Sequence, residues 1–233
     1  MCNSKNRCYI GKRRLDSAIK QLHDEDGLDI VVKWHPWLLS PKLIRSGLVV
    51  DKRTSYVKKL GSDARFHDMV KHFEAIGRED DVQINFDYSK GVISSSLDAH
   101  RLVLWCQSTG RPKQTLALVE QLFSAYHEDG SNIGDHSILL DCVYRAGLDM
   151  LAAEHVLKGN DYRRQVGEQV LQAQRRHSVS GVPHFIITAA AGKVGRRSFA
   201  FGGAQNTDFL LNVVRKLAQG ALSDSINNID SKL

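Results

Sequence analysis

The fold of this chain is decided by one stretch, Ser180-Gly181-Val182-Pro183-His184-Phe185-Ile186-Ile187, where a small turn leads into one proline and an apolar run. Proline lacks the N–H that a strand ladder needs, so Pro183 is expected at the first residue of a strand. The β-branched run behind it predicts a short buried strand over residues 184–188. The Val182–Pro183 peptide bond can also be cis, because proline tolerates that form cheaply. An ordinary junction between a loop and a strand would fit the same residues.

The residues on either side of this strand predict an α/β arrangement. Residues 197–201 are expected to pair with it antiparallel, and a last helix is expected to begin at Asn206 or Thr207. Near the N-terminus, the spacing of apolar residues predicts a helix over residues 9–23. A β-branched run predicts a further strand over residues 28–34.

A long helical block separates these two halves. Residues 41–159 are expected to be wholly helical, and a polar helix capped by Asn160 or Asp161 follows them. Without this block the order is helix–strand, then strand–strand–helix, which is a thioredoxin-like core lacking its first strand. The predicted fold class is therefore α/β, with a large all-helical insertion. The expected domains are a discontinuous core over residues 1–40 and 160–221, a helical insertion over 41–159 and a polar tail over 222–233.

The composition argues against several classes of function. The 233 residues carry a formal net charge of +6, but the basic residues are scattered without interleaved aromatics, so no nucleic-acid partner is expected. None of the four cysteines forms a C-x-x-C pair or a zinc cluster, so no metal is expected. Cys106 and Cys142 lie on apolar helical faces and are expected to be inert core thiols. No membrane span or signal peptide is visible, which predicts a cytoplasmic protein with reduced thiols.

Six short segments, in order along the chain, carry a resemblance to a known family. They are Cys8-Tyr9-Ile10-Gly11-Lys12-Arg13-Arg14-Leu15, Ala99-His100-Arg101-Leu102, Leu122-Phe123-Ser124-Ala125-Tyr126, Ala146-Gly147-Leu148, Ser180-Gly181-Val182-Pro183 and Gly203-Ala204-Gln205. Together they resemble the DsbA-like thioredoxin-fold proteins, and within them the FrnE-type subgroup. The resemblance implies a protein-disulfide oxidoreductase without a bound cofactor, with a cis peptide at Pro183 beside its redox motif.

The redox motif departs from the family pattern, which is Cys-Pro-Trp-Cys followed by Tyr-Ile-Gly. Aligned on Tyr9-Ile10-Gly11, the chain has Lys5 in place of the first motif cysteine and keeps only the second, Cys8. The apolar strand that precedes the motif in the family is also absent. Residues 1–7 therefore indicate either a truncated or mis-spliced N-terminus or a divergent member of the family.

Cys8 is the candidate catalytic residue. It is expected at the N-terminus of the first helix, facing the proline turn, where the helix dipole favours the thiolate and Lys5, Arg7 and Lys12 lie near in sequence. The thiolate is the form that attacks a disulfide. Turnover of the resulting mixed disulfide needs a second thiol, for which Cys2, six residues earlier, is the candidate.

Val182 and Pro183 are the candidate substrate-binding residues, because the resemblance implies that the residue before the cis proline offers its backbone to an extended substrate. The expected partner is a thiol- or disulfide-containing protein or small molecule, with glutathione as a candidate co-substrate. Two other functions stay open: a glutathione-binding relative of kappa-class glutathione transferases and chromene-carboxylate isomerases, and a non-catalytic thioredoxin-fold binding protein. His100 is expected to pack or to bond a backbone group rather than to catalyse.

Overall fold

The structure, a computed structural model, describes residues 4–39, 47–189 and 197–220. Its contacts divide the chain into two compact units. One, called the sheet unit below, consists of the chain up to residue 30, residues 77–83 and the chain from residue 179 on. The other, the helical unit, consists of residues 31–76 and 84–178. This division is based on packing contacts and does not test the domain boundaries expected from the sequence, which stay a prediction.

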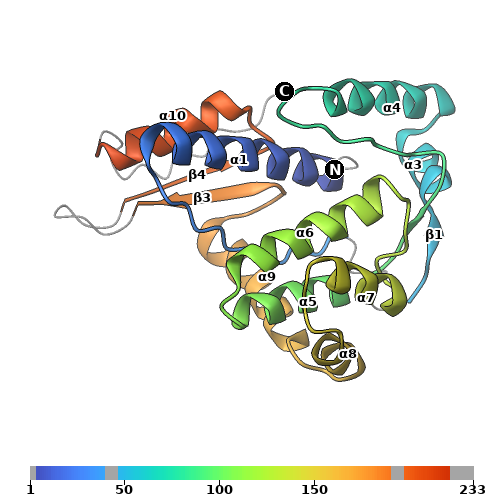
Figure 1. Ribbon diagram of the computed structural model, residues 1–233. Helices are drawn as coiled ribbons and strands as arrows, with labels where there is room; N and C mark the ends of the chain where they lie inside the picture. Colours follow the sequence, from blue (N-terminus) through green and yellow to red (C-terminus); the bar gives the residue numbers. More distant parts are fainter. Residues whose placement is uncertain (1–3, 40–46, 190–196, 221–233) are drawn as a thin grey trace. The chain divides into compact units, whose positions relative to one another are not determined.

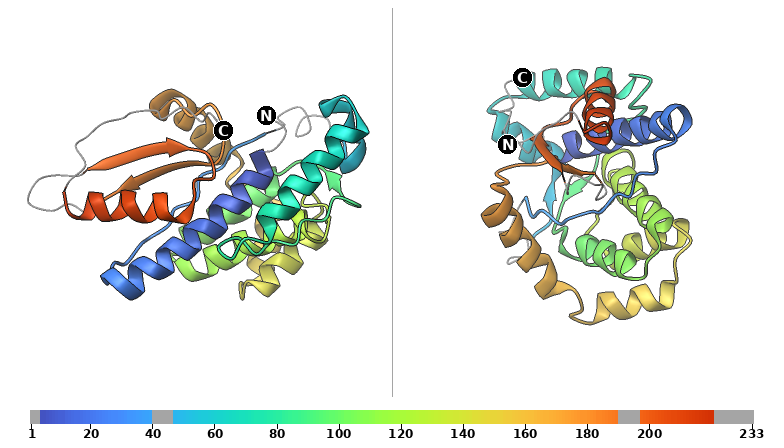
Figure 2. Two further views of the ribbon diagram at one scale, coloured as in Figure 1. Left: turned by 90° about the horizontal axis from the view of Figure 1, so that it is seen from above. Right: turned by 90° about the vertical axis from the view of Figure 1, so that its left-hand side faces the viewer.

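The sheet unit contains the strand that follows Pro183. β3 (His184–Thr188) pairs antiparallel with β4 (Ser198–Gly202), which confirms both predicted strands. α1 (Ser4–Asp26) and α10 (Thr207–Ala218) pack against each other beside this hairpin (Figures 1 and 2). The predicted last helix is confirmed, and the side chain of its N-cap residue, Asn206, accepts the N–H of Phe209 at 2.8 Å.

Phenylalanine rings form the contact between this hairpin and its helices. The register pairs Phe185 with Phe201, so both side chains lie on one face, and their rings stack with centroids 5.1 Å apart. Phe209 of α10 meets Phe201 edge-on at 5.0 Å. Successive strand residues point to opposite faces, so Ile186 lies on the other face and is 44% exposed. The hairpin is therefore covered on one face by the core of its own unit.

The strand predicted over residues 28–34 does not form. The structure has no strand there, and among the described residues the ladder of β3 is made with β4 alone. Leu28 and Ile30 still pack, half-buried, against the core of the sheet unit. A β-branched run becomes a strand only where a neighbour accepts its hydrogen bonds, and a thioredoxin-like core without its first strand offers none here.

The helical unit has its core where four helices meet. α5 (Leu97–Ser108), α6 (Pro112–His127), α7 (His136–Arg145) and α8 (Met150–Lys158) surround a cluster that includes Leu102, Leu118, Leu139 and Val143, each fully buried. The remaining helices are α3 (Lys52–Leu60), α4 (Asp63–Gly77) and α9 (Arg163–His177).

Two local predictions for this unit were wrong. The block is not wholly helical, because β1 (Val50–Asp51) and β2 (Val92–Ile93) form a short antiparallel pair. The N-cap of α9 is Tyr162, with φ 62°, rather than Asn160 or Asp161. The carbonyl oxygen of Asp161 instead accepts a 2.7 Å hydrogen bond from Nε of Arg101. The backbone at Asp161 therefore provides a hydrogen-bond acceptor for this buried arginine.

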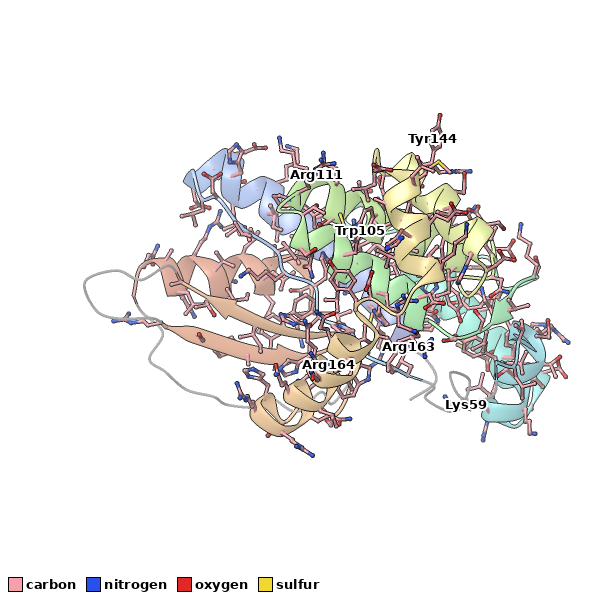
Figure 3. All side chains as sticks on the ribbon, turned by 90° about the horizontal axis from the view of Figure 1, so that it is seen from below. Lys59, Trp105, Arg111, Tyr144, Arg163 and Arg164 are labelled. Atoms are coloured by element: carbon pink, nitrogen blue, oxygen red, sulfur yellow. The ribbon has the colours of Figure 1, made fainter. Side chains whose placement is uncertain are left out.

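The surface of the helical unit carries separate basic and aromatic side chains (Figure 3). Lys59 lies on α3, Arg111 precedes α6, and Arg163 and Arg164 begin α9. Tyr144 of α7 projects to solvent and is 68% exposed. Among the described residues, no helix combines the length and apolar character that crossing a membrane requires.

Candidate functional site

α1 carries Cys8 one turn further inside the helix than the sequence predicted. The helix begins at Ser4 rather than at residue 9, so Cys8 is its fifth residue. The unpaired N–H groups of a helix belong to its first four residues, and the dipole acts mainly within the first turn. Placing Cys8 at the helix terminus was therefore wrong. Lys5 and Arg7 continue the helix because neither residue breaks it.

Cys8 lies on the face of α1 that turns toward the sheet. Helical spacing places Cys8, Gly11, Leu15 and Ala18 along one stripe, at intervals of three and four residues. Leu15 and Ala18 belong to the cluster that packs around Phe201 and α10. Gly11 is buried, whereas Cys8, one turn nearer the N-terminus, is half-buried.

Gly11 brings this face into contact with the proline turn. A Cβ atom built on Gly11 would lie 3.3 Å from Cγ of Pro183 and 3.2 Å from Cζ of Phe185. It would also lie 3.7 Å from Cα of Ala204, in the loop after β4. The first two contacts are tighter than most Cβ contacts, so a side chain here would require Pro183 and Phe185 to shift. The helix that carries Cys8 and the turn before β3 are therefore adjacent.

The proline turn is fixed from the β4 side. The Val182–Pro183 peptide bond is cis, and the carbonyl oxygen of Pro183 accepts the N–H of Gly203 at 2.8 Å. Gly203 has φ 84°, a left-handed conformation that suits glycine. Pro183 is buried and Val182 is half-buried, so the backbone before the proline lies at the border between core and surface.

Two basic residues that follow Cys8, Lys12 and Arg13, bond to partners on α1 itself. Nζ of Lys12 lies 2.6 Å from Oδ2 of Asp16, and the Lys12 side chain is only 5% exposed. Nη2 of Arg13 donates to the hydroxyl of Tyr9 at 3.1 Å. The positive charge that the sequence places near Cys8 is thus partly neutralised on the helix itself.

Arg14, two turns after Cys8, joins three segments of the sheet unit. Its Nη1 donates to the carbonyl oxygen of Ala204 at 2.9 Å, and its Nη2 donates to Oε2 of Glu79 at 2.5 Å. Its Nε lies 3.6 Å from Oδ2 of Asp81, which also accepts the hydroxyl of Thr207 at 2.6 Å. Sequence reasoning missed this network, because Glu79 and Asp81 lie in a polar loop of the expected helical insertion.

The remaining candidates lie elsewhere. Cys106 and Cys142 are buried in the helical unit, which confirms them as core thiols; burial raises the pKa of both thiols, and that of Cys142 to about 11. Nε2 of His100 lies 3.2 Å from the carbonyl oxygen of Trp37, so His100 bonds a backbone group as expected. Cys2 lies outside the described residues, so its part as a resolving thiol stays a prediction.

No group of metal-ligating side chains occurs among the residues that the structure describes. An open hollow of about 490 Å³ lies in the helical unit, lined in part by Trp105, His155 and Tyr162. None of the candidate site residues lines it. Among the described residues, the candidate site residues Cys8, Val182 and Pro183 all lie in the sheet unit.

Comparison with known proteins supports the thioredoxin-like fold expected from the sequence. A family model described as a DSBA-like thioredoxin domain matches residues 7–215. The Bacillus subtilis protein YwbO, itself uncharacterised, is 23% identical over 204 residues, covering 82% of this chain and 87% of its own.

Two solved structures share the fold at 20% identity. One is a probable DsbA oxidoreductase from Streptomyces coelicolor, with a TM-score of 0.75, in which the match covers 94% of this chain and 87% of that one. The other is a 2-hydroxychromene-2-carboxylate isomerase, with a TM-score of 0.58 and 92% of each chain covered.

Proposed function

Because the chain belongs to the family of DSBA-like thioredoxin domains, we propose that it is a thiol–disulfide oxidoreductase of the FrnE type, with Cys8 as its reactive thiol. The observation that supports this proposal most is the approach of Gly11 to Pro183, which makes the Cys8 face of α1 and the Val182–Pro183 turn neighbours. Val182 would hold the substrate through its backbone, as an added extended segment is held at a strand edge.

The reaction we propose is exchange through a single motif thiol. The Cys8 thiolate attacks one sulfur of a substrate disulfide, so that a Cys8–substrate disulfide forms, the substrate disulfide breaks, and the second sulfur leaves as a thiolate. A second thiolate then attacks the Cys8 sulfur of the mixed disulfide, so that the Cys8–substrate bond breaks and the substrate leaves as a thiolate. With Cys2 as this thiol a Cys2–Cys8 disulfide forms, and with glutathione a Cys8–glutathione disulfide forms; a further glutathione attacks the glutathione sulfur of the latter, which gives oxidised glutathione and frees Cys8. Position 5 is lysine and supplies no thiol.

The substrates in this proposal are thiol- or disulfide-containing proteins or small molecules. The proposed location is the cytoplasm, where thiols are kept reduced and an external thiol is abundant. With Lys5 in the first motif position, we expect turnover to be slower than for a two-cysteine motif and to depend on the concentration of that external thiol.

Reduction of insulin by the protein in the presence of glutathione tests this function. We expect activity in the wild type, its loss in Cys8→Ala, and its retention in the matched control Cys106→Ala, which removes a buried thiol from the helical unit. Equal activity in wild type and Cys8→Ala would show that Cys8 is not the reactive thiol. An inactive wild type that still binds peptides would support a non-catalytic binding protein instead.

A second candidate function is glutathione binding of the kind expected for chromene-carboxylate isomerase relatives. The observation that favours it is the likeness in fold to 2-hydroxychromene-2-carboxylate isomerase over 92% of each chain. Retention on glutathione-agarose that survives in Cys8→Ala would support this candidate. Loss of retention in Cys8→Ala would show that retention requires the Cys8 thiol and would favour the oxidoreductase.

A further inference from the structure

Arg14 connects the helix that carries Cys8 with two segments far away in the sequence. It lies on α1, three residues after Gly11, and its side chain is 14% exposed. One edge of its guanidinium group donates to the backbone of Ala204, and the other faces the carboxylates of Glu79 and Asp81. A planar guanidinium can serve several acceptors at once, which a lysine ammonium at the end of a flexible stem cannot do with the same geometry.

A short chain of contacts leads from Arg14 to the proline turn. Arg14 fixes the carbonyl of Ala204, and the preceding residue, Gly203, donates its N–H to the carbonyl oxygen of Pro183 at 2.8 Å. Ala204 also lies against Gly11, so the same loop is held between α1 and the turn. Through this loop, Arg14 influences the position of Pro183 relative to α1.

The acidic segment 77–83 closes the network on its second side. Asp81 accepts the hydroxyl of Thr207, the first residue of α10, at 2.6 Å, and Thr207 is 7% exposed. The loop after β4 is thus held at two points. Arg14 binds Ala204 within the loop, and Asp81 binds Thr207 directly after it. This segment belongs to the sheet unit by its contacts, although the chain on both sides of it belongs to the helical unit.

From these contacts we infer that Arg14 is a positioning residue. Together with Glu79 and Asp81 it holds the loop of residues 203–206, and through that loop the Val182–Pro183 turn, against the face of α1 that carries Cys8. Arg14 takes no part in the sulfur chemistry. It sets where a substrate held at Val182 lies relative to the Cys8 thiolate, and in this respect the inference rests on the proposed function.

The sheet unit offers a matched control in Arg215. This arginine of α10 also bonds two carboxylates, donating to Glu25 at 2.6 Å and to Asp26 at 2.9 Å. It ties α10 to the C-terminal end of α1, away from the proline turn. Arg215→Ala therefore removes an arginine that also bonds two carboxylates of the sheet unit, without touching the loop of residues 203–206.

Hydrogen exchange of the Gly203 amide tests the positioning role without any enzyme assay. We expect exchange about tenfold faster in Arg14→Ala, because local opening of the loop becomes easier. Arg14→Lys should give an intermediate rate, because lysine keeps the positive charge but lacks the planar set of donors of a guanidinium group. Arg215→Ala should leave the rate unchanged. Equal Gly203 exchange in Arg14→Ala and Arg215→Ala would overturn the inference.

The functional readout compares two reactions of Cys8. Alkylation by iodoacetamide reports the thiol alone, and we expect its rate to be unchanged in Arg14→Ala. The rate of mixed-disulfide formation with a disulfide-containing peptide should fall about tenfold, because misplacement of a bound substrate slows reaction with an intact nucleophile. A parallel fall in both rates would contradict the inference. A wild type that forms no mixed disulfide would reject the proposed function, while Gly203 exchange would still decide the role of Arg14.

Discussion

Replacing Gly11 by alanine tests the contact on which the site depends. The new Cβ would lie 3.2 Å from Cζ of Phe185 and 3.3 Å from Cγ of Pro183, closer than most Cβ contacts in proteins. Two opposing effects decide the outcome. Alanine stabilises a helix interior by about 1 kcal/mol relative to glycine. Overpacking a filled contact costs about 1–3 kcal/mol. We therefore expect Gly11→Ala to change the free energy of unfolding by between about zero and about 2 kcal/mol, in the destabilising direction.

Gly167 provides the reference for the helix effect alone. It lies inside α9, and a Cβ built there meets nothing within 4 Å. Gly167→Ala should therefore stabilise the protein by about 1 kcal/mol.

Urea denaturation of both variants measures the difference, which should be about 1–3 kcal/mol. The mixed-disulfide rate of Cys8 with a disulfide peptide should fall in Gly11→Ala and stay unchanged in Gly167→Ala. If Gly11→Ala stabilised the protein as much as Gly167→Ala does, α1 would not lie against Pro183 as described.

Three further predictions concern other residues. Lys5→Cys should complete a two-cysteine motif with Cys8 and raise the rate of insulin reduction at least about tenfold, measured against wild type in the same glutathione buffer. Iodoacetamide at pH 8 should modify Cys8 in the folded protein but Cys142, whose pKa is raised to about 11 by burial, only after unfolding, as peptide mass mapping would show. Burial lowers the pKa of Lys52 to about 8 from 10.5, so the unfolded chain binds more protons between these values. The Lys52 contribution to the free energy of unfolding should therefore rise with pH across that window, by up to about 3 kcal/mol, and urea titrations should show this rise as the difference between wild type and Lys52→Met.

The sequence predicted those parts of the fold that depend on local patterns. A proline before a β-branched run marked β3, and Asn206, one of the two residues expected to cap the last helix, is its N-cap. These signals succeed because an N-cap side chain or the missing N–H of a proline acts within a few residues.

The parts that could not be predicted depend on distant neighbours. Residues 28–34 have the composition of a strand but lack a partner for its ladder. The contact of Arg14 with Glu79 joins residues 65 positions apart, and nothing in the local sequence of either marks the pair. The close approach at Gly11 is likewise visible only once α1 and β3 are placed together. The proline turn and its strand were thus predicted, but the long-range contacts of Gly11 and Arg14 were not.

The most direct test of the central claim is to trap the mixed disulfide on Cys8. Wild type, Cys8→Ser and Cys2→Ser are incubated with a peptide disulfide at neutral pH, quenched with acid and measured by intact mass. We predict one peptide adduct on Cys2→Ser, located at Cys8 by digestion and reversed by reductant, and none on Cys8→Ser. Wild type should carry the same adduct or, where Cys2 has resolved it, a Cys2–Cys8 disulfide. No adduct on Cys2→Ser, or an equal adduct on Cys8→Ser, would contradict the account.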